Sequence, residues 1–264
     1  MNKCIAICLG LAIAGCAGTG TGPGPGPDTA SYTPAGSGTE TAGQSRARIH
    51  TELAAGYFEL GNYGVALQEA NEALKSDPDF APALNVLGLV YMELRDDRAA
   101  ESNFQKALRV NPSDSDANNN YGWYLCLRKR EQESIKYFLA ALRNPLYTSP
   151  DKSWVNAGIC ARQSGDLSAA DGYFQQALKI RPSQPQALFQ LADMAYRRRS
   201  HPEAKSYLVR LLRDIEPTVE TLWLALRVER GLGDRDAEAS LGFQLRTKFP
   251  DSREARALIA GQFE

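Results

Sequence analysis

Few residues of this 264-residue chain are spaced for acid–base, metal or phosphate chemistry. The two histidines, His50 and His201, lie far apart, and no cysteine stands near either of them at the spacing of zinc ligands. No Gly-rich loop separates a predicted strand from a predicted helix, so a phosphate-binding loop is not indicated. Acidic pairs at 96–97 and at Asp114 and Asp116 fall in polar turns and at predicted helix starts, where helix capping explains them. The sequence therefore predicts no catalytic residue, no metal site, no cofactor and no enzymatic activity.

Cys16 is the residue with the clearest predicted chemistry. Lys3 precedes an apolar run at 5–13 that is too short for a permanent membrane span and fits a secretory signal. The run ends in Ile-Ala-Gly-Cys at 13–16, which resembles the bacterial lipobox, in which the cysteine is lipid-modified and becomes the first mature residue. The alternative is an ordinary signal peptide that ends near a cysteine. Ala17, rather than Asp, follows the cysteine, and in the sorting pattern of Gram-negative bacteria this implies transfer to the outer membrane.

The predicted N-terminal organisation is a signal peptide at 1–15, followed by the lipidated cysteine and a tether at 16–46. Acyl chains contribute about 0.8 kcal/mol per buried methylene, so several of them on Cys16 would hold the protein stably on a membrane. The tether contains a run of alternating Gly with Thr or Pro and little that could form a core. A flexible chain of this length reaches about 30 Å. The rest of the protein could therefore contact a partner fixed in the same membrane.

The elements that position any binding residues are helices in a repeat of 34 residues. In the copy at 81–114, two stretches carry apolar residues at helical spacing, a polar run at 93–98 contains the turn, and Pro112 closes the unit. The two apolar faces consist of Leu84, Leu87, Gly88 and Tyr91, and of Ala100, Phe104, Ala107 and Leu108. This is the tetratricopeptide (TPR) pattern, in which small residues lie where the paired helices cross closely.

The same template recurs in copies at 47–80, 81–114, 115–150, 151–184, 185–218 and 219–252. The third copy is two residues longer, and the last two match fewer template positions. Residues 253–264 are expected to form a short helix over the last copy, because a terminal repeat needs a more polar outer face. The predicted fold is all-α: a right-handed superhelix of six TPR units with a C-terminal capping helix, spanning 47–264.

Cys126 and Cys160 are the cysteines that remain once the signal is removed and Cys16 carries lipid. They fall near the ends of the first helices of adjacent copies. Packed helix axes lie about 8–10 Å apart, so a disulfide between the two residues is geometrically feasible. An oxidising periplasm permits such a bond. The alternative is two buried thiols that act as small hydrophobic residues.

Without a catalytic site, the predicted function is binding in the concave groove that the first helices line. The predicted protein-binding residues are Asn85, Leu89, Met92, Asn119, Trp123, Ile159, Phe189 and Tyr196. Aromatic and amide side chains suit an extended or helical segment, because amides pair with backbone groups that burial would leave unsatisfied. Trp123 is the first candidate, since the repeat does not need a large residue at its position. The alternative for Trp123 is packing between helices.

Charge gives no reason to expect nucleic-acid binding. The net charge is −1, and the basic clusters at 128–130 and 197–199 lie at the ends of predicted first helices. Cations there complement the helix dipole, so solvated helix ends are favoured over phosphate or lipid sites.

The segment Asn-Asn-Asn-Tyr-Gly-Trp-Tyr-Leu-Cys at 118–126 resembles the signature of the type IV pilus biogenesis/stability proteins (PilW, called PilF in some bacteria). The resemblance extends to the lipobox and to 46–264, including 156–160, 222–230 and 258–263, although Tyr124 stands where many relatives carry Phe. It implies an outer-membrane lipoprotein built from six TPR units, with a pilotin role. Such a protein helps the secretin, the ring through which the pilus leaves, to reach the outer membrane and multimerise, as twitching motility requires.

The expected function is therefore a non-enzymatic scaffold on the periplasmic face of the outer membrane of a Gram-negative bacterium. Its expected partners are the secretin and other pilus assembly proteins, with membrane contact through the N-terminal lipid and no nucleic acid. Delivery and multimerisation of the secretin both stay open as the assisted step, as do the concave and convex faces as the contact. The alternative in the same fold is a general periplasmic adaptor for outer-membrane protein assembly or for a cell-wall hydrolase or protease. A peptidoglycan-active enzyme is a third class and would require activity from the purified repeats.

Overall fold

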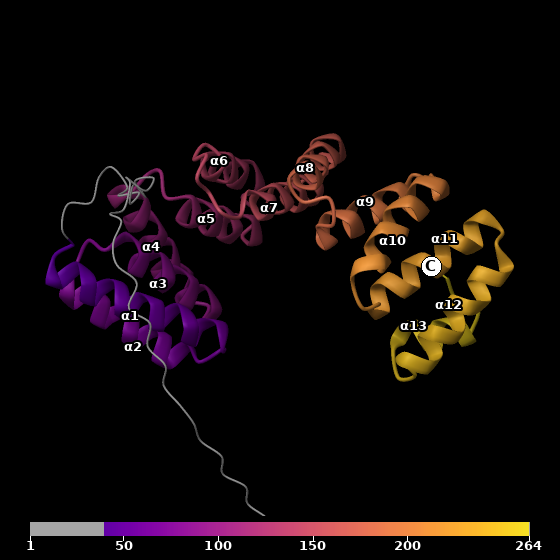
Figure 1. Ribbon diagram of the computed structural model, residues 1–264, viewed down its shortest axis with the longest axis horizontal. Helices are drawn as coiled ribbons and strands as arrows, with labels where there is room; N and C mark the ends of the chain where they lie inside the picture. The colour runs from indigo at the N-terminus through magenta and orange to yellow at the C-terminus, as the bar shows by residue number, and fades with distance from the viewer. Residues whose placement is uncertain (1–39, 264) are drawn as a thin grey trace, which may run out of the picture. The chain divides into compact units, whose positions relative to one another are not determined.

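The computed structural model describes residues 40–263, and every regular element within them is an α-helix (Figure 1). The predicted signal peptide at 1–15, the lipidation at Cys16 and most of the predicted tether lie outside the described residues. The thirteen helices of the described part are, in chain order, α1 Ala42–Glu59, α2 Tyr63–Ser76, α3 Ala81–Glu93, α4 Asp97–Val110, α5 Ser115–Leu127, α6 Glu131–Ala141, α7 Pro150–Gln163, α8 Leu167–Ile180, α9 Pro185–Arg197, α10 His201–Asp214, α11 Val219–Leu232, α12 Arg235–Lys248 and α13 Arg253–Ile259.

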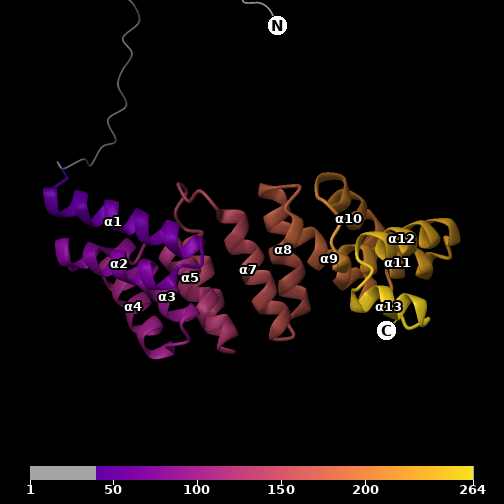
Figure 2. The same cartoon turned by 90° about the horizontal axis from the view of Figure 1, so that it is seen from below.

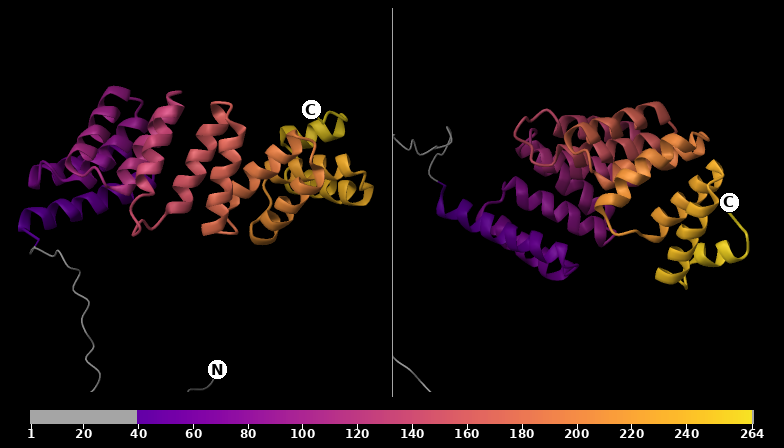
Figure 3. Two further views of the ribbon diagram at one scale, coloured as in Figure 1. Left: turned by 90° about the horizontal axis from the view of Figure 1, so that it is seen from above. Right: turned by 45° about the vertical axis from the view of Figure 1, so that its right-hand side comes forward.

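The helices form consecutive pairs, from α1 with α2 to α11 with α12, and α13 follows the last pair. The first helix of each pair contacts the first helix of the next, so α1, α3, α5, α7, α9 and α11 form one side of the stack. The pairs lie side by side in chain order, as the colour gradient in Figures 2 and 3 shows. This arrangement confirms the predicted all-α architecture of stacked helix pairs.

Helix α1 begins at Ala42, inside the segment 16–46 that the sequence analysis assigned to the tether. Thr41 and Gln44 form a capping box: the Gln44 backbone N–H donates to Thr41 Oγ1 at 3.2 Å, and the Thr41 backbone N–H donates to Gln44 Oε1 at 3.1 Å. Two backbone donors of the first turn are thereby satisfied, which starts the helix before the repeat template does. The Thr-x-x-Gln spacing was the sequence feature that could have placed this boundary.

Glycine and phenylalanine interlock within the second, third and fourth pairs. The three phenylalanines are fully buried, and a Cβ atom added to the facing glycine would lie within 2.9 Å of the ring. The glycine–phenylalanine pairs are Gly88 with Phe104, Gly122 with Phe138, and Gly158 with Phe174. Glycine is required in these helices because the ring occupies the volume of its missing side chain, which offsets the lower helix propensity of glycine.

The last two pairs fill the same crossing point with different residues. Ala192 and Leu208 take these positions in the fifth pair, and both are buried. In the sixth pair the large residue is on the first helix and the small one on the second: a Cβ on Gly242 would lie 3.6 Å from Leu226 Cδ1. In both pairs a small residue still meets a large one at the crossing, while the residue types change.

The stack ends with α13, as expected for residues 253–264. Leu222, Leu245 and Ala255 form a buried cluster that joins α11, α12 and α13. Ser252 caps α13 by accepting a hydrogen bond from the Ala255 backbone N–H at 3.0 Å. None of the helices in the described part of the chain is long and apolar enough to cross a membrane.

Candidate protein-binding face

The eight residues predicted to bind a partner all lie on first helices of consecutive pairs. Asn85, Leu89 and Met92 are on α3, Asn119 and Trp123 on α5, Ile159 on α7, and Phe189 and Tyr196 on α9. These four helices contact one another in chain order. We call the surface that carries the eight residues the groove face. Seven of the eight side chains are partly buried, and Asn85 is only 8% exposed.

A chain of amide side chains crosses the groove face from α3 to α7. Asn120 Nδ2 donates to Asn85 Oδ1 at 3.2 Å, and Asn119 Nδ2 donates to Asn120 Oδ1 at 3.3 Å. Asn119 Oδ1 then accepts from Asn156 Nδ2 at 3.0 Å and from Ser153 Oγ at 2.9 Å. These bonds hold the amide planes in place, so their remaining donors and acceptors are preorganised for backbone groups of a partner. The sequence indicated Asn85 and Asn119 but missed the other three residues.

Trp123 lies beside this amide chain and packs against the neighbouring pair. Its partly buried ring contacts the cluster of Cys126, Phe138, Ala157 and Cys160. Trp123 is therefore an interhelix packing residue on one side, as the alternative interpretation held, while part of its surface stays accessible on the groove face. Because this cluster already fixes one side of the Trp123 ring, the ring would lose little conformational freedom when a partner covers its other side.

The structure joins Cys126 of α5 to Cys160 of α7 by a disulfide, with Cα atoms 5.8 Å apart. Both residues are at most 1% exposed, so neither sulfur atom is part of the accessible groove face. The bond instead ties the first helices of the third and fourth pairs together directly beneath Trp123.

Farther along the groove face, two arginines converge on a buried carboxylate. Asp193 of α9 is only 8% exposed and accepts hydrogen bonds from Arg162 of α7 and, at 2.8 Å, from Arg197 Nε. Arg162 also donates to Gln190. Burial by itself raises the pKa of Asp193, but the hydrogen bonds from Arg197 and Arg162 outweigh it and hold the pKa below its ordinary value. This ion pair links α7 to α9.

We expect Asp193→Asn to lower the free energy of unfolding by about 2 kcal/mol at pH 7, because two arginines lose a charged acceptor. A carboxylate with a lowered folded-state pKa stabilises the fold above its unfolded pKa of about 3.9, and this stabilisation disappears as the pH falls through the folded value. The difference between wild type and variant should therefore shrink below about pH 4. Urea unfolding at several pH values from 6 to 3 measures the difference in the free energy of unfolding. The control is Asp236→Asn, which changes an exposed carboxylate on α12. A difference that stays constant with pH would contradict the assignment.

An uncovered apolar stripe runs along α1. Ile49, Leu53 and Leu60 are 48%, 45% and 80% exposed, and with Gly56 and Tyr57 they line a shallow cavity of about 470 Å³. In later pairs the preceding pair covers the corresponding face of the first helix, whereas α1 has no preceding pair among the described residues. The repeat pattern does not reveal this surface, because Leu53 and Tyr57 lie 34 residues before Leu87 and Tyr91 and so match positions that the pattern assigns to the core.

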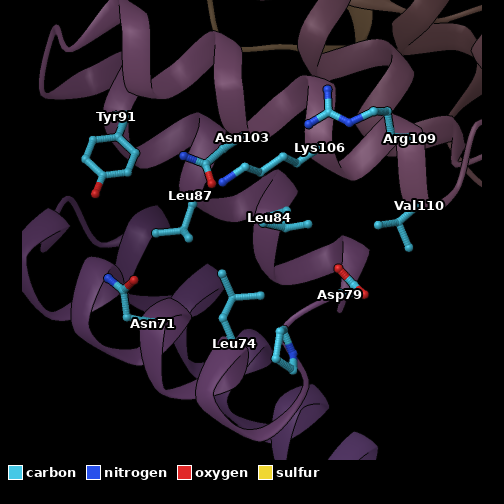
Figure 4. Close-up of a pocket in the computed structure, with 11 residues that line it drawn as sticks. Asn71, Leu74, Asp79, Leu84, Leu87, Tyr91, Asn103, Lys106, Arg109 and Val110 are labelled. Atoms are coloured by element: carbon cyan, nitrogen blue, oxygen red, sulfur yellow. The ribbon is translucent and has the colours of Figure 1, made fainter.

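A second cavity, of about 720 Å³, lies between α2, α3 and α4 (Figure 4). Leu74, Leu84 and Leu87 are among its apolar lining residues, and Lys106 and Arg109 of α4 lie along one side. None of the eight predicted binding residues lines it. Asp79 is the single carboxylate among its lining residues.

In the basic cluster at 128–130, expected to be a solvated helix end, Lys129 is exposed, whereas the two arginines are partly buried and form ion pairs. Arg128 pairs with Asp97 of α4 and lies 4.8 Å from the centre of the Tyr124 ring. Arg130 pairs with Glu101 of α4 at 2.7 Å and with Glu133 at 2.9 Å. These arginines therefore connect the third pair to the second helix of the pair before it.

Metal-ligating side chains do not gather at one place in the described part of the chain. Among residues 40–263, no group of three or more His, Cys, Asp or Glu side chains is placed to hold a metal ion. Asp96 and Asp114 accept from the backbone N–H groups of Ala99 and Ala117 at 3.0 and 2.9 Å, as helix caps do.

Comparisons with known proteins agree with this helical array. A family model described as tetratricopeptide repeat matches residues 51–101, 87–146 and 155–217. The chain is 29% identical over 213 residues to the type IV pilus assembly protein PilF of Pseudomonas aeruginosa, covering 80% of this chain and 84% of that protein. The chain is also similar to the crystal structure of PilW, a widely conserved type IV pilus biogenesis factor. The identity is 32% and the TM-score 0.73, and the match covers 81% of this chain and 98% of that one. A structure of Pseudomonas aeruginosa PilF matches with 27% identity, a TM-score of 0.76, and coverage of 84% and 100%.

Proposed function

Because the chain belongs to the tetratricopeptide-repeat family of type IV pilus biogenesis proteins, we propose that it is a scaffold that promotes assembly of the pilus secretin at the outer membrane. The observation that carries the proposal is the groove face, where preorganised amides and a partly exposed tryptophan lie on a repeat array like those of PilF and PilW. The protein acts by binding, not by catalysis. Other pilus assembly proteins are further partners of the same scaffold.

The proposed contact is a secretin segment that lies along α3, α5 and α7. Asn119 and Asn156 pair with its backbone groups, and the buried Asn85 holds Asn120 in place behind them. Leu89 and Trp123 cover its apolar side chains. Amides fixed by hydrogen bonds to each other need not be ordered on binding, which lowers the entropic cost of capturing an extended segment. The chemistry of this face favours a polypeptide over a small molecule.

The proposed location is the periplasmic face of the outer membrane of a Gram-negative bacterium. Lipid on Cys16 would anchor the chain, and a Gly- and Pro-rich tether would let the repeats reach about 30 Å from the anchor. Anchor and secretin would then share one membrane, which raises their effective concentration for each other.

Cells that lack the gene should lose detergent-resistant secretin multimers, and wild-type protein should restore them. Trp123→Ala should fail to restore them, because truncating a central aromatic contact costs about 2 kcal/mol or more of binding. A gel blot of membranes, probed for the secretin, measures the multimers in the deletion strain and in each complemented strain. The control is Phe243→Ala, which removes an aromatic ring that is 64% exposed on α12, away from the groove face.

Each outcome of the blot has a definite meaning. Multimers that persist in the deletion would reject the secretin role and favour a general periplasmic adaptor for outer-membrane protein assembly, a cell-wall hydrolase or a protease. Full rescue by Trp123→Ala would reject the groove face as the contact while leaving the secretin role intact. In the same strain, Cys16→Ala tests whether the lipid is needed for delivery.

A further inference from the structure

Four arginines line one cavity near the C-terminal end of the array. The cavity, of about 460 Å³, lies where the end of α9, the start of α10 and the end of α11 meet the last described residues. Its lining consists of Tyr196, Arg197, Arg199, His201, Arg227, Arg230, Gly231 and Phe263. We call it the arginine pocket. No carboxylate is among its lining residues, although the chain as a whole carries a net charge of −1.

Two of the four arginines have no carboxylate partner. Arg197 pairs with Asp193 at 2.8 Å and Arg230 with Glu238 at 2.7 Å. Arg199 and Arg227 form no salt bridge within residues 40–263. Positive charge in the pocket is therefore only partly compensated, which favours an anionic ligand.

Aromatic rings hold Arg227 in the pocket wall. Its guanidinium carbon lies 4.8 Å from the centre of the Tyr196 ring and 5.6 Å from that of Trp223. Arg227 Nε is shielded from solvent and has no hydrogen-bond partner. A guanidinium fixed by stacking holds its terminal nitrogens in one plane, which suits a planar two-point contact with a carboxylate.

His201 supplies a second shielded group without a partner. Its Nδ1 is buried and forms no hydrogen bond, and its ring lies 5.6 Å from the Tyr196 ring. The imidazole lies directly on α11, because a Cβ on Gly231 would be 2.7 Å from His201 Nε2. Buried polar atoms are normally paired, and both of these unpaired atoms belong to residues that line the same basic cavity.

The pocket also has an apolar side, formed by the end of the chain. The Phe263 ring stacks on Trp223 with ring centres 5.8 Å apart, and the Arg230 guanidinium carbon lies 3.8 Å from the Phe263 ring centre. Through Arg197 and Tyr196 the pocket is continuous with the groove face. A polypeptide with both acidic and apolar side chains matches these walls better than a bare phosphate does.

We propose that the arginine pocket binds an acidic segment of a protein partner, with a carboxylate seated between Arg199 and Arg227. The site extends the groove face, so a single partner could occupy the amide chain and the arginine pocket together. The inference rests on the proposed function only in taking the ligand to be a polypeptide. It does not require that the partner be the secretin.

The test is binding of two fluorescein-labelled hexapeptides to the purified full-length protein, measured by fluorescence anisotropy. One peptide alternates Glu with Phe, and the other has Gln in place of Glu. The Glu peptide should bind at least tenfold more tightly than the Gln peptide. Arg227→Gln should remove at least tenfold of this affinity and Arg199→Gln several-fold, whereas Arg213→Gln, a surface arginine outside the pocket, should leave it unchanged.

Two further variants separate geometry from charge and from misfolding. Arg227→Lys keeps the charge but loses the planar fork, so its affinity should fall between wild type and Arg227→Gln. Arg199 is exposed and without a salt-bridge partner, so Arg199→Gln should leave the far-UV circular dichroism spectrum unchanged.

Equal binding of the two peptides, or unchanged affinity in both Gln variants, would overturn the proposal. Displacement of the Glu peptide by inorganic phosphate at equal concentration would also overturn the proposal, because the pocket would then be a phosphate site. A negative peptide result beside a positive secretin blot would reject the arginine pocket and keep the proposed function.

Discussion

Reduction of the Cys126–Cys160 disulfide is expected to lower the free energy of unfolding by about 3–4 kcal/mol. The bond spans 34 residues of sequence and joins the first helices of the third and fourth pairs. In the unfolded chain it removes the conformational freedom of a loop of that size, which destabilises the unfolded state. The loss should be concentrated in the middle of the array, because stability in repeat proteins is carried by contacts between neighbouring units.

Urea unfolding with and without reductant measures this effect. The double variant Cys126→Ala/Cys160→Ala is the control: it should resemble reduced wild-type protein and should not respond to the reductant. Both residues are buried, so the alanines also remove a small amount of apolar contact, which reduced wild type retains. Alkylation of both thiols in native protein without prior reduction would contradict the disulfide.

Gly158→Val should destabilise the fold by about 3 kcal/mol. A Cβ at this position would lie 2.5 Å from Phe174 Cε1, and Phe174 is fully buried, so the ring cannot move aside without displacing its neighbours. Valine has the higher helix propensity, but by only a few tenths of a kcal/mol, so the steric term dominates.

Gly172→Val is the matched control for this prediction. Gly172 lies within α8 and has no atom within 4 Å of an added Cβ, so the same substitution should change the free energy of unfolding by less than about 0.5 kcal/mol. Chemical denaturation of the two variants beside wild type gives the comparison. Equal stabilities for the two variants would show that the Gly158–Phe174 contact does not limit the packing of the fourth pair.

Local sequence patterns were sufficient for the repeat architecture. Apolar residues recur at the spacing of one helix face, and polar turns and closing prolines separate the apolar stretches. These patterns predicted stacked helix pairs and a terminal cap, and the structure has both. Such patterns work because each helix buries its apolar stripe against neighbours that are close in sequence. The start of α1 was predicted too late because the Thr41–Gln44 capping box was overlooked.

The binding residues were predicted only in part, since the template gives a residue's position on its helix but not its neighbours in space. Asn85 and Asn119 were identified singly, whereas their connection through Asn120 depends on the distance between α3 and α5. Arg128 and Arg130 were expected at solvated ends and instead pair with α4, because stacking brings that helix within reach.

By itself, the sequence determined the helices, their pairing and the family, because these depend on residue periodicity and on motifs that are continuous in the chain. Tertiary structure alone decided which side chains meet across neighbouring pairs. The disulfide, the amide chain and the joining of Arg199 with Arg227 in one pocket all require the rotation between successive pairs. That rotation results from the summed packing of many side chains, including the exchange of large and small residues at Leu226 and Gly242, and no local pattern encodes it.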